Sequence, residues 1–279
     1  MVVDFHTHAF PDELAFRAMS TLRTNSGDIY DPVHDGTIAG LLANMNTCSI
    51  DVSVLLPVVT KHSQVKKTNE WAASQRCESI TPFGSIYPHT DSYREDIDYV
   101  VELGLRGIKM HAEYQSFIVD DPHMLRIYDY ALSRDLIILH HAGFDPAFPA
   151  PFRSSPQQFA NVVKAMRGGT LVIAHLGGHD QWDDVERYLV GTDVYLDTSM
   201  GFEFYPHDTF MRIVKNHGAD RILFGSDAPW SNAKTEIKQL NSLALSPEEV
   251  DLILGKNAQR VLGIDAGHAY DESSESTCG

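Results

Sequence analysis

Short apolar, β-branched segments alternate with longer amphipathic segments along the whole chain. Eight of the short segments are candidate strands, and several of these are almost continuously apolar, which is typical of strands that are covered on both faces. These predicted strands are residues 2–6, 52–56, 82–86, 106–110, 136–139, 170–174, 194–197 and 221–225. Strands that alternate with helices predict a parallel sheet of the α/β class, and eight such units favour a closed (β/α)8 TIM barrel in a single domain.

The amphipathic segments predict the helices that join these strands. They cover residues 91–103, 124–134, 156–166, 183–189 and 208–217. Residues 9–37 form an unusually long connection, interrupted by proline and glycine, and we expect it to be a loop that covers the active site. Ser246 is expected to cap a late helix, and a short helix follows at 255–262. We therefore assign residues 1–264 to the barrel and residues 265–279, which are polar, to a disordered tail.

Composition excludes several classes of partner. The net charge of −16 argues against binding to nucleic acid or to an anionic membrane surface. No apolar run approaches the roughly 20 residues that a membrane helix needs, and the N-terminus does not resemble a signal peptide. The three cysteines, Cys48, Cys77 and Cys278, are scattered and form no CxxC pair, which is typical of a reduced protein. We expect a cytoplasmic protein that binds a small-molecule substrate.

Polar residues that suit a metal site fall at the C-terminal ends of the predicted strands, where barrels of this type carry their chemistry. They are His6, His8, Lys109, His111, His140, His141, His175 and Asp227. Residues i and i+2 of a strand point to the same side, so His6 and His8 aim two imidazoles at one place. Two imidazoles and a carboxylate such as Asp227 suit zinc and related divalent metals. Among the other histidines, His89 is expected to lie near the mouth, whereas most, His179 among them, are expected on the surface.

Four motifs of the chain resemble the amidohydrolase superfamily. They are His6-Thr7-His8, His141-Ala142-Gly143, His175-Leu176-Gly177-Gly178 and the segment 225–230. The resemblance runs from residue 3 to about residue 263 and is closest to the amidohydrolase 2 branch. That branch holds metal-dependent hydrolases and the decarboxylases related to aminocarboxymuconate-semialdehyde decarboxylase. The motifs are specific for the superfamily but not for one reaction.

The resemblance implies a role for each strand-end residue. His6, His8 and Asp227 would bind the metal, together with His141, which fits the family's His-x-Gly pattern better than His140 does. His175 would bind a second ion or act in catalysis. Some two-metal members carry a carboxylated lysine at the position of Lys109. We expect Lys109 to stay an ammonium group that binds a substrate carboxylate or pairs with a neighbour, and therefore expect one divalent ion, zinc, in preference to two.

The leading functional hypothesis is hydrolysis of a small ester, lactone or amide, often with a carboxylate nearby, by a metal-activated water. Asp227 would move the proton, His175 would polarise the carbonyl group, and Lys109 or His111 would bind an anionic group. The alternative is non-oxidative decarboxylation of an aromatic or enoic acid. Aromatic residues near the mouth would stack on such a substrate: Phe202, Phe204, Tyr205 and Trp230. Barrels of this type often dimerise, so a homodimer is a further expectation. A metal-binding protein without catalysis is disfavoured because no expected ligand is missing.

Overall fold

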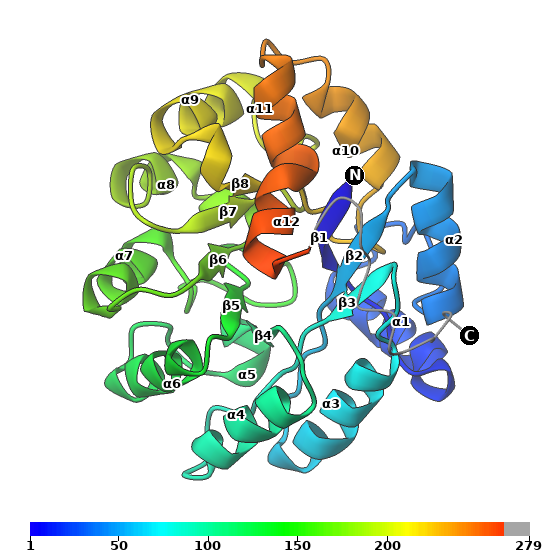
Figure 1. Ribbon diagram of the computed structural model, residues 1–279, viewed down its shortest axis with the longest axis vertical. Coiled ribbons are helices and arrows are strands. Elements are labelled where there is room, and N and C mark those ends of the chain that lie inside the picture. Colours follow the sequence, from blue (N-terminus) through cyan, green and yellow to red (C-terminus); the bar gives the residue numbers. More distant parts are fainter. Residues whose placement is uncertain (265–279) are drawn as a thin grey trace.

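The computed structural model describes residues 1–264, and in them eight parallel strands are surrounded by a ring of helices (Figure 1). The strands are β1 (Val3–Thr7), β2 (Val52–Leu55), β3 (Ile80–Pro82), β4 (Gly107–Met110), β5 (Ile137–His140), β6 (Leu171–Ile173), β7 (Tyr195–Asp197) and β8 (Ile222–Leu223). The surrounding helices are α2 (Ile38–Cys48), α3 (Val65–Ser74), α4 (Tyr93–Glu102), α6 (Pro122–Ser133), α7 (Pro156–Ala165), α8 (Trp182–Tyr188), α9 (His207–His217) and α10 (Ala233–Leu240). The predicted tail, with Cys278, lies outside the described residues.

The strands close into a barrel. They pair in parallel in the orders β1-β2-β3 and β4-β5-β6-β7-β8. One seam between the two sets is bridged where the amide of Lys109 donates to the carbonyl of Gly84 at 2.8 Å. The other is bridged where the amide of Phe5 donates to the carbonyl of Phe224, also at 2.8 Å. The predicted TIM barrel is therefore confirmed.

Strand alternation divides the core into two layers. Side chains such as Phe5, Phe83 and Leu139 form a small apolar cluster inside the barrel. A larger cluster fills the space between the strands and the helices. His140 belongs to the outer layer, where its ring contacts Tyr128 of α6 edge-on. His141 follows on the inner side, so alternation alone separates these two adjacent histidines.

Local sequence signals explain where several helices begin. The carboxylate of Asp121 accepts from the amide of His123 at the start of α6, directly before a proline at the first helical position. Ser246 caps α11 (Pro247–Asp251) as predicted, because its hydroxyl accepts from the amide of Glu249. A π-helical turn, η4 (Leu252–Lys256), and then α12 (Asn257–Leu262) follow.

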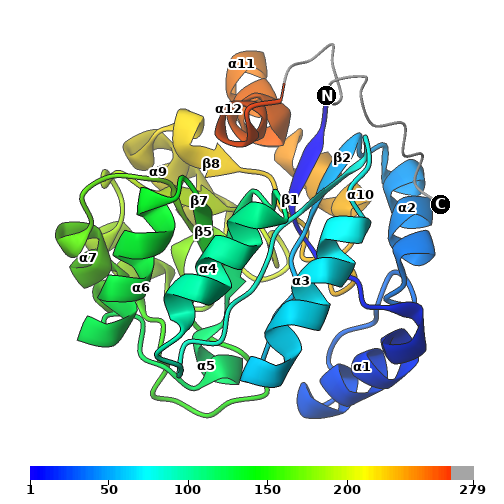
Figure 2. The same cartoon turned by 60° about the horizontal axis from the view of Figure 1, so that its bottom comes forward.

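The connection after β1 differs from the prediction. Residues 9–37 are not simply a loop, because α1 (Asp12–Asn25) occupies much of them. Only Ala15 and Met19 of this helix are buried, so its apolar periodicity was too weak to be recognised. Figure 2 shows α1 and α5 (Ala112–Gln115) at the end of the barrel where the strands finish, opposite α11 and α12.

Two further expectations can be compared with the structure. None of the helices within residues 1–264 is long and apolar enough to cross a membrane. Cys48 is a buried free thiol, as expected.

Candidate metal-binding active site

A cavity of about 230 Å³ opens at the C-terminal ends of the strands. It is lined by all but one of the strand-end residues named from the sequence, and by one predicted substrate-binding residue: His6, His8, Lys109, His111, His141, His175, Asp227 and Trp230. The exception is His140, which is fully buried in the outer layer and does not line the cavity. The fold thus brings together residues that are up to 224 positions apart, from His6 to Trp230.

His6, His8 and Asp227 form one corner of the cavity. Oδ1 of Asp227 lies 3.3 Å from Nε2 of His6 and 3.0 Å from Nε2 of His8. In β1, the pairing register with β2 shifts between Asp4 and Thr7, beside His6 and His8. After β8, the amide of Asp227 donates to the carbonyl of His6 at 2.8 Å. The end of β1 and the segment after β8 therefore position all three side chains together.

The hydrogen bonds of the two imidazoles determine which atoms face this corner. Nδ1 of His6 contacts Oδ2 of Asp197 at 2.9 Å, and Nδ1 of His8 contacts the carbonyl of Leu56 at 2.8 Å. Both partners can only accept, so each Nδ1 carries the proton. In the neutral rings, Nε2 of His6 and of His8 then present lone pairs to a carboxylate oxygen. Lone-pair atoms that converge in this way favour a cation beside them, and two imidazole nitrogens with one carboxylate oxygen are a donor set that fits a divalent metal.

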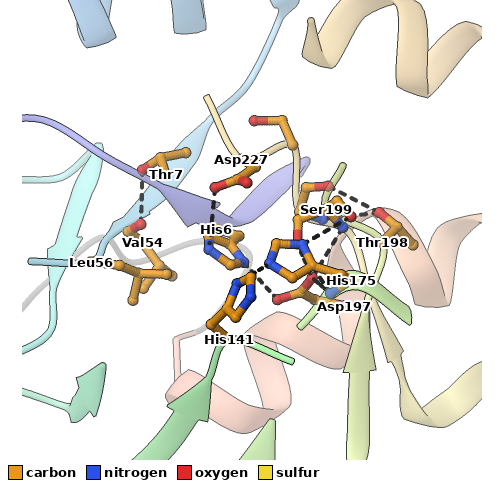
Figure 3. A network of polar contacts seen from close by, with 12 residues as sticks. His6, Thr7, Val54, Leu56, His141, His175, Asp197, Thr198, Ser199 and Asp227 are labelled. Atoms are coloured by element: carbon orange, nitrogen blue, oxygen red, sulfur yellow. Dashed lines mark hydrogen bonds and ion pairs between the residues drawn. The ribbon is translucent and has the colours of Figure 1, made fainter. Parts of the chain in front are cut away.

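A network behind this corner fixes His175 and His141 (Figure 3). The hydroxyl of Ser199 donates to Oδ1 of Asp197, so it accepts from Nδ1 of His175 at 2.9 Å. Nε2 of His175 is then an acceptor, and Nδ1 of His141 donates to it at 2.9 Å. Neither ring nitrogen of His175 is free in this arrangement. The predicted role of His175 at a substrate carbonyl would require its contact with His141 to open.

Lys109 lies inside the barrel and is 1% exposed. Its Nζ donates to Nε2 of His6 at 2.9 Å, so the ammonium group supplies positive charge to the corner described above. Burial lowers the pKa of Lys109 to about 8, against the opposing charges of Asp227 and Asp197. Lys109 is still charged at neutral pH. Its ammonium group lies beside His6, in the position of a group that would bind a substrate carboxylate or serve as a metal ligand.

His111, His141 and Asp145 form a second group of possible ligands. Oδ2 of Asp145 lies 3.3 Å from Nε2 of His111, and the ring of His111 stacks on that of His141 at 4.0 Å with an angle of 8°. Parallel rings direct their in-plane lone pairs side by side rather than toward one point. This group therefore fits a cation less well than the corner formed by His6, His8 and Asp227.

The charge states follow from burial and from close partners. Burial lowers the pKa of His141 well below its usual value and that of His175 to about 3, so both rings are neutral at pH 7. Although burial alone would raise the pKa of Asp227, positive charge on His6 and a hydrogen bond from His8 hold it well below its usual range, so Asp227 is a carboxylate. A divalent metal would take the place of that positive charge, beside this carboxylate and the neutral rings of His141 and His175.

Sequence reasoning missed three residues of this region and misplaced others. Asp197 was recognisable only as the last residue of a predicted strand, Ser199 and Asp145 carried no signal, and His179 lines the cavity instead of lying on the surface. His89 does not line the cavity, and its ring instead contacts the carbonyl of Gln115. Among the aromatic residues expected near the mouth, Phe202 and Tyr205 are buried against Phe210, whereas Trp230 lines the cavity.

A family model described as Amidohydrolase matches residues 3–264, nearly the whole chain. The chain belongs to the amidohydrolase family. The predicted resemblance is thereby confirmed, and the protein is an enzyme of this superfamily with His and Asp groups that could bind a metal. No protein among the curated sequences matches the chain.

Several solved structures share the fold of this chain. An uncharacterised TIM-barrel protein from Bordetella bronchiseptica has a TM-score of 0.75 and 18% identity, covering 94% of this chain and 98% of that one. A 2,6-dihydroxybenzoate decarboxylase from Rhizobium has a TM-score of 0.66 and 16% identity, with coverages of 94% and 98%. A 5-carboxyvanillate decarboxylase from Novosphingobium aromaticivorans, solved with manganese and a substituted benzoic acid, has a TM-score of 0.69 and 12% identity, with coverages of 95% and 97%. At these identities the similarity establishes the fold.

Proposed function

We propose that this amidohydrolase family member is a metal-dependent decarboxylase that removes a carboxyl group from an aromatic or enoic acid without oxidation. This was the second of the two hypotheses from the sequence. The observation that carries it is the aromatic part of the lining of the cavity that contains His6, His8 and Asp227. Five aromatic side chains contribute to that lining: Phe10, Tyr30, Tyr114, Phe144 and Trp230. A flat, apolar substrate ring would be buried against such side chains.

The residues of the corner suit this reaction. His6, His8 and Asp227 would hold the divalent metal, with His141 as a further ligand. When bound, the metal would orient the substrate carboxylate and withdraw negative charge from it. The buried ammonium of Lys109 provides a second positive group for the same carboxylate. In the overall step the bond between the ring carbon and the carboxyl carbon breaks, carbon dioxide leaves, and a proton replaces it on the ring carbon.

The proton would be delivered from the same wall of the cavity. We assign this step to Asp227, which lines the cavity beside His6 and His8 and would pass a proton from solvent to the ring carbon. His175 would act through His141, whose Nδ1 it contacts. The N,N,O donor set suits zinc, our expectation from the sequence, and it also suits manganese, which the related decarboxylase contains.

The test is release of ¹³CO₂ from carboxyl-labelled hydroxybenzoic and enoic acids by protein that has been stripped and then reloaded with zinc or manganese. We expect release with the loaded protein, none with the stripped protein, and none with Asp227→Asn. In D₂O the product should carry one deuterium at the vacated carbon. Absence of labelled carbon dioxide across the panel, with metal bound, would contradict the proposal.

Hydrolysis of a small ester, lactone or amide is the second candidate. It is favoured by Asp227, a carboxylate beside the cation-binding corner that can accept the proton of a metal-bound water. A panel of aryl esters and lactones, assayed with the same loaded protein, separates the two reactions. Turnover of that panel without carbon dioxide release would favour hydrolysis.

A further inference from the structure

His179 is a cavity residue whose ring has no hydrogen-bond partner among residues 1–264. It follows β6 in the chain and is 5% exposed. Its Nδ1 is sealed from solvent without a partner. Nε2 of His179 also makes no hydrogen bond within the described part of the chain, but this atom is not fully buried. The residue lines the cavity. The ring therefore turns one unpaired polar atom toward the substrate space.

Burial determines which nitrogen carries the proton. Burial lowers the pKa of His179, so the ring is neutral at pH 7 and has one N–H. A sealed N–H group without an acceptor is rarer and more costly than a sealed lone pair. The lone pair is therefore placed on Nδ1 and the proton on Nε2. His179 presents a hydrogen-bond donor to the cavity.

The position of this donor is fixed before any substrate arrives. The amide of His179 donates to the carbonyl of Ala142, and its carbonyl accepts from the amide of Phe144, both at 2.9 Å. Gly143 lies so close that a Cβ there would meet the backbone N and O of His179 at 2.4 Å. Edge contacts with Phe204 at 5.0 Å and Trp182 at 5.7 Å hold the ring itself. A donor held this rigidly loses little conformational freedom on binding.

Nearby charges indicate the kind of acceptor that this donor would meet. The carboxylates of Asp145 and Asp227 are both close enough to His179 to act on its charge state. Lys109 is the cationic side chain among the cavity-lining residues that the structure describes. A second carboxylate on the substrate would be repelled by the two aspartates, whereas a neutral oxygen would not. The surroundings therefore favour a neutral oxygen acceptor.

We propose that Nε2–H of His179 binds a neutral oxygen substituent on the substrate, a hydroxyl, ether or carbonyl oxygen, and so selects oxygen-substituted acids over unsubstituted ones. The proposal rests on the proposed function, because it takes the substrate to be an aromatic or enoic acid. It adds a specificity-determining residue on the wall that carries His175, whose ring lies 6.0 Å from that of His179.

The test measures dissociation constants on manganese-loaded protein by calorimetry, for benzoate and for the hydroxy- and methoxybenzoates. His179→Phe keeps an aromatic ring and removes the polar atom, whereas His179→Gln keeps a donor. Trp182→Phe is the matched control, because it alters packing around His179 without removing that donor. We expect the best oxygen-substituted ligand to bind the wild type about 3- to 10-fold more tightly than benzoate, the range of one net hydrogen bond.

In His179→Phe this preference should fall to about 1, with benzoate affinity unchanged, and in His179→Gln and Trp182→Phe it should persist. An undiminished preference in His179→Phe would overturn the inference while leaving the proposed function intact, and so would an equal loss of affinity for benzoate and for its substituted forms. If His179→Phe does not fold, His179→Leu replaces it in the test. The inference would then be overturned if the preference for oxygen-substituted ligands were kept in His179→Leu but lost in Trp182→Phe. If the loaded wild type binds no benzoate and releases no carbon dioxide, the proposed function fails and the inference with it.

Discussion

Replacing Asp197 with asparagine should weaken metal binding without any change to a residue that contacts the metal. Asp197 is fully buried at the end of β7, and each of its partners is a donor. Oδ2 accepts from Nδ1 of His6 at 2.9 Å, while Oδ1 accepts from the amides of His175 at 3.1 Å and Ser199 at 3.0 Å. Asparagine replaces one acceptor with an NH₂ group, which then faces a donor in either orientation of the amide.

The size of the effect follows from the role of this carboxylate. Partners that orient a ligating histidine are worth about 10- to 100-fold in metal affinity, or about 1.4 to 2.7 kcal/mol. Burial alone would raise the pKa of Asp197, but its interaction with His6, whose Nδ1–H donates to Oδ2, outweighs burial and lowers the pKa to about 2. A depressed pKa stabilises the fold above the unfolded value of 3.8, and this stabilisation is lost as the pH falls toward 2. The shift corresponds to about 2 kcal/mol of unfolding free energy at pH 7.

The assay is competition with a chelator for zinc, together with urea unfolding of the metal-free protein at pH 7. Asp184→Asn makes the same chemical change on an exposed face of α8 and should alter neither quantity. A folded Asp197→Asn protein with wild-type zinc affinity would refute the reasoning, because it would show that His6 needs no carboxylate to hold its tautomer.

Three further predictions concern other parts of the account. Burial raises the pKa of Glu236 to about 7, so the contribution of Glu236 to stability is present below pH 4.5 and is lost as the pH rises through 7. Glu236→Gln removes this dependence on pH. Urea unfolding at pH 5 and pH 8 should therefore show the variant more stable than the wild type by up to about 3 kcal/mol at pH 8 only. Lys109→Met removes a positive charge 2.9 Å from Nε2 of His6, so metal affinity by chelator competition should be retained or increased; a carboxylated lysine would instead make this variant lose metal. Gly143→Ala should lower the free energy of urea unfolding by more than about 3 kcal/mol, because φ of Gly143 is +83° and the new Cβ would clash with the backbone. Gly27→Ala should lower it by about 1 kcal/mol, because φ of Gly27 is +70° but no atom lies within 4 Å of the new Cβ. Equal losses in the two variants would contradict this prediction.

Short apolar runs allowed most of the fold and part of the site to be predicted. They placed eight strands, although the third lies at Ile80–Pro82 rather than at residues 82–86. Alternation implied only that one of His140 and His141 faces the interior, and the family's His-x-Gly pattern favoured His141, which lines the cavity whereas His140 faces the helices. The contacts of Asp197 could not be predicted, since they join residues that are 191 positions apart through the curvature of the barrel. The position of His179 could not be predicted either, because it depends on how a loop after β6 crosses Gly143.

The reaction was ranked differently once the cavity was known. From the sequence, hydrolysis came first, because strand-end ligands alone suit a metal-activated water. The aromatic lining depends on side chains such as Tyr30 and Phe144, which come from connections that the periodicity did not resolve. Substrate preference lies in these connections, and they are the part of a barrel that strand patterns describe least well.

The central claim is that His6, His8 and Asp227 hold a catalytic divalent metal. The most direct test is anomalous scattering at the zinc and manganese edges from a crystal of the purified protein, with metal content measured on the same sample. We predict about one metal ion per chain and one anomalous peak between Nε2 of His6, Nε2 of His8 and Oδ1 of Asp227. A peak only beside His111 and Asp145, or a fully active protein without metal, would contradict the account.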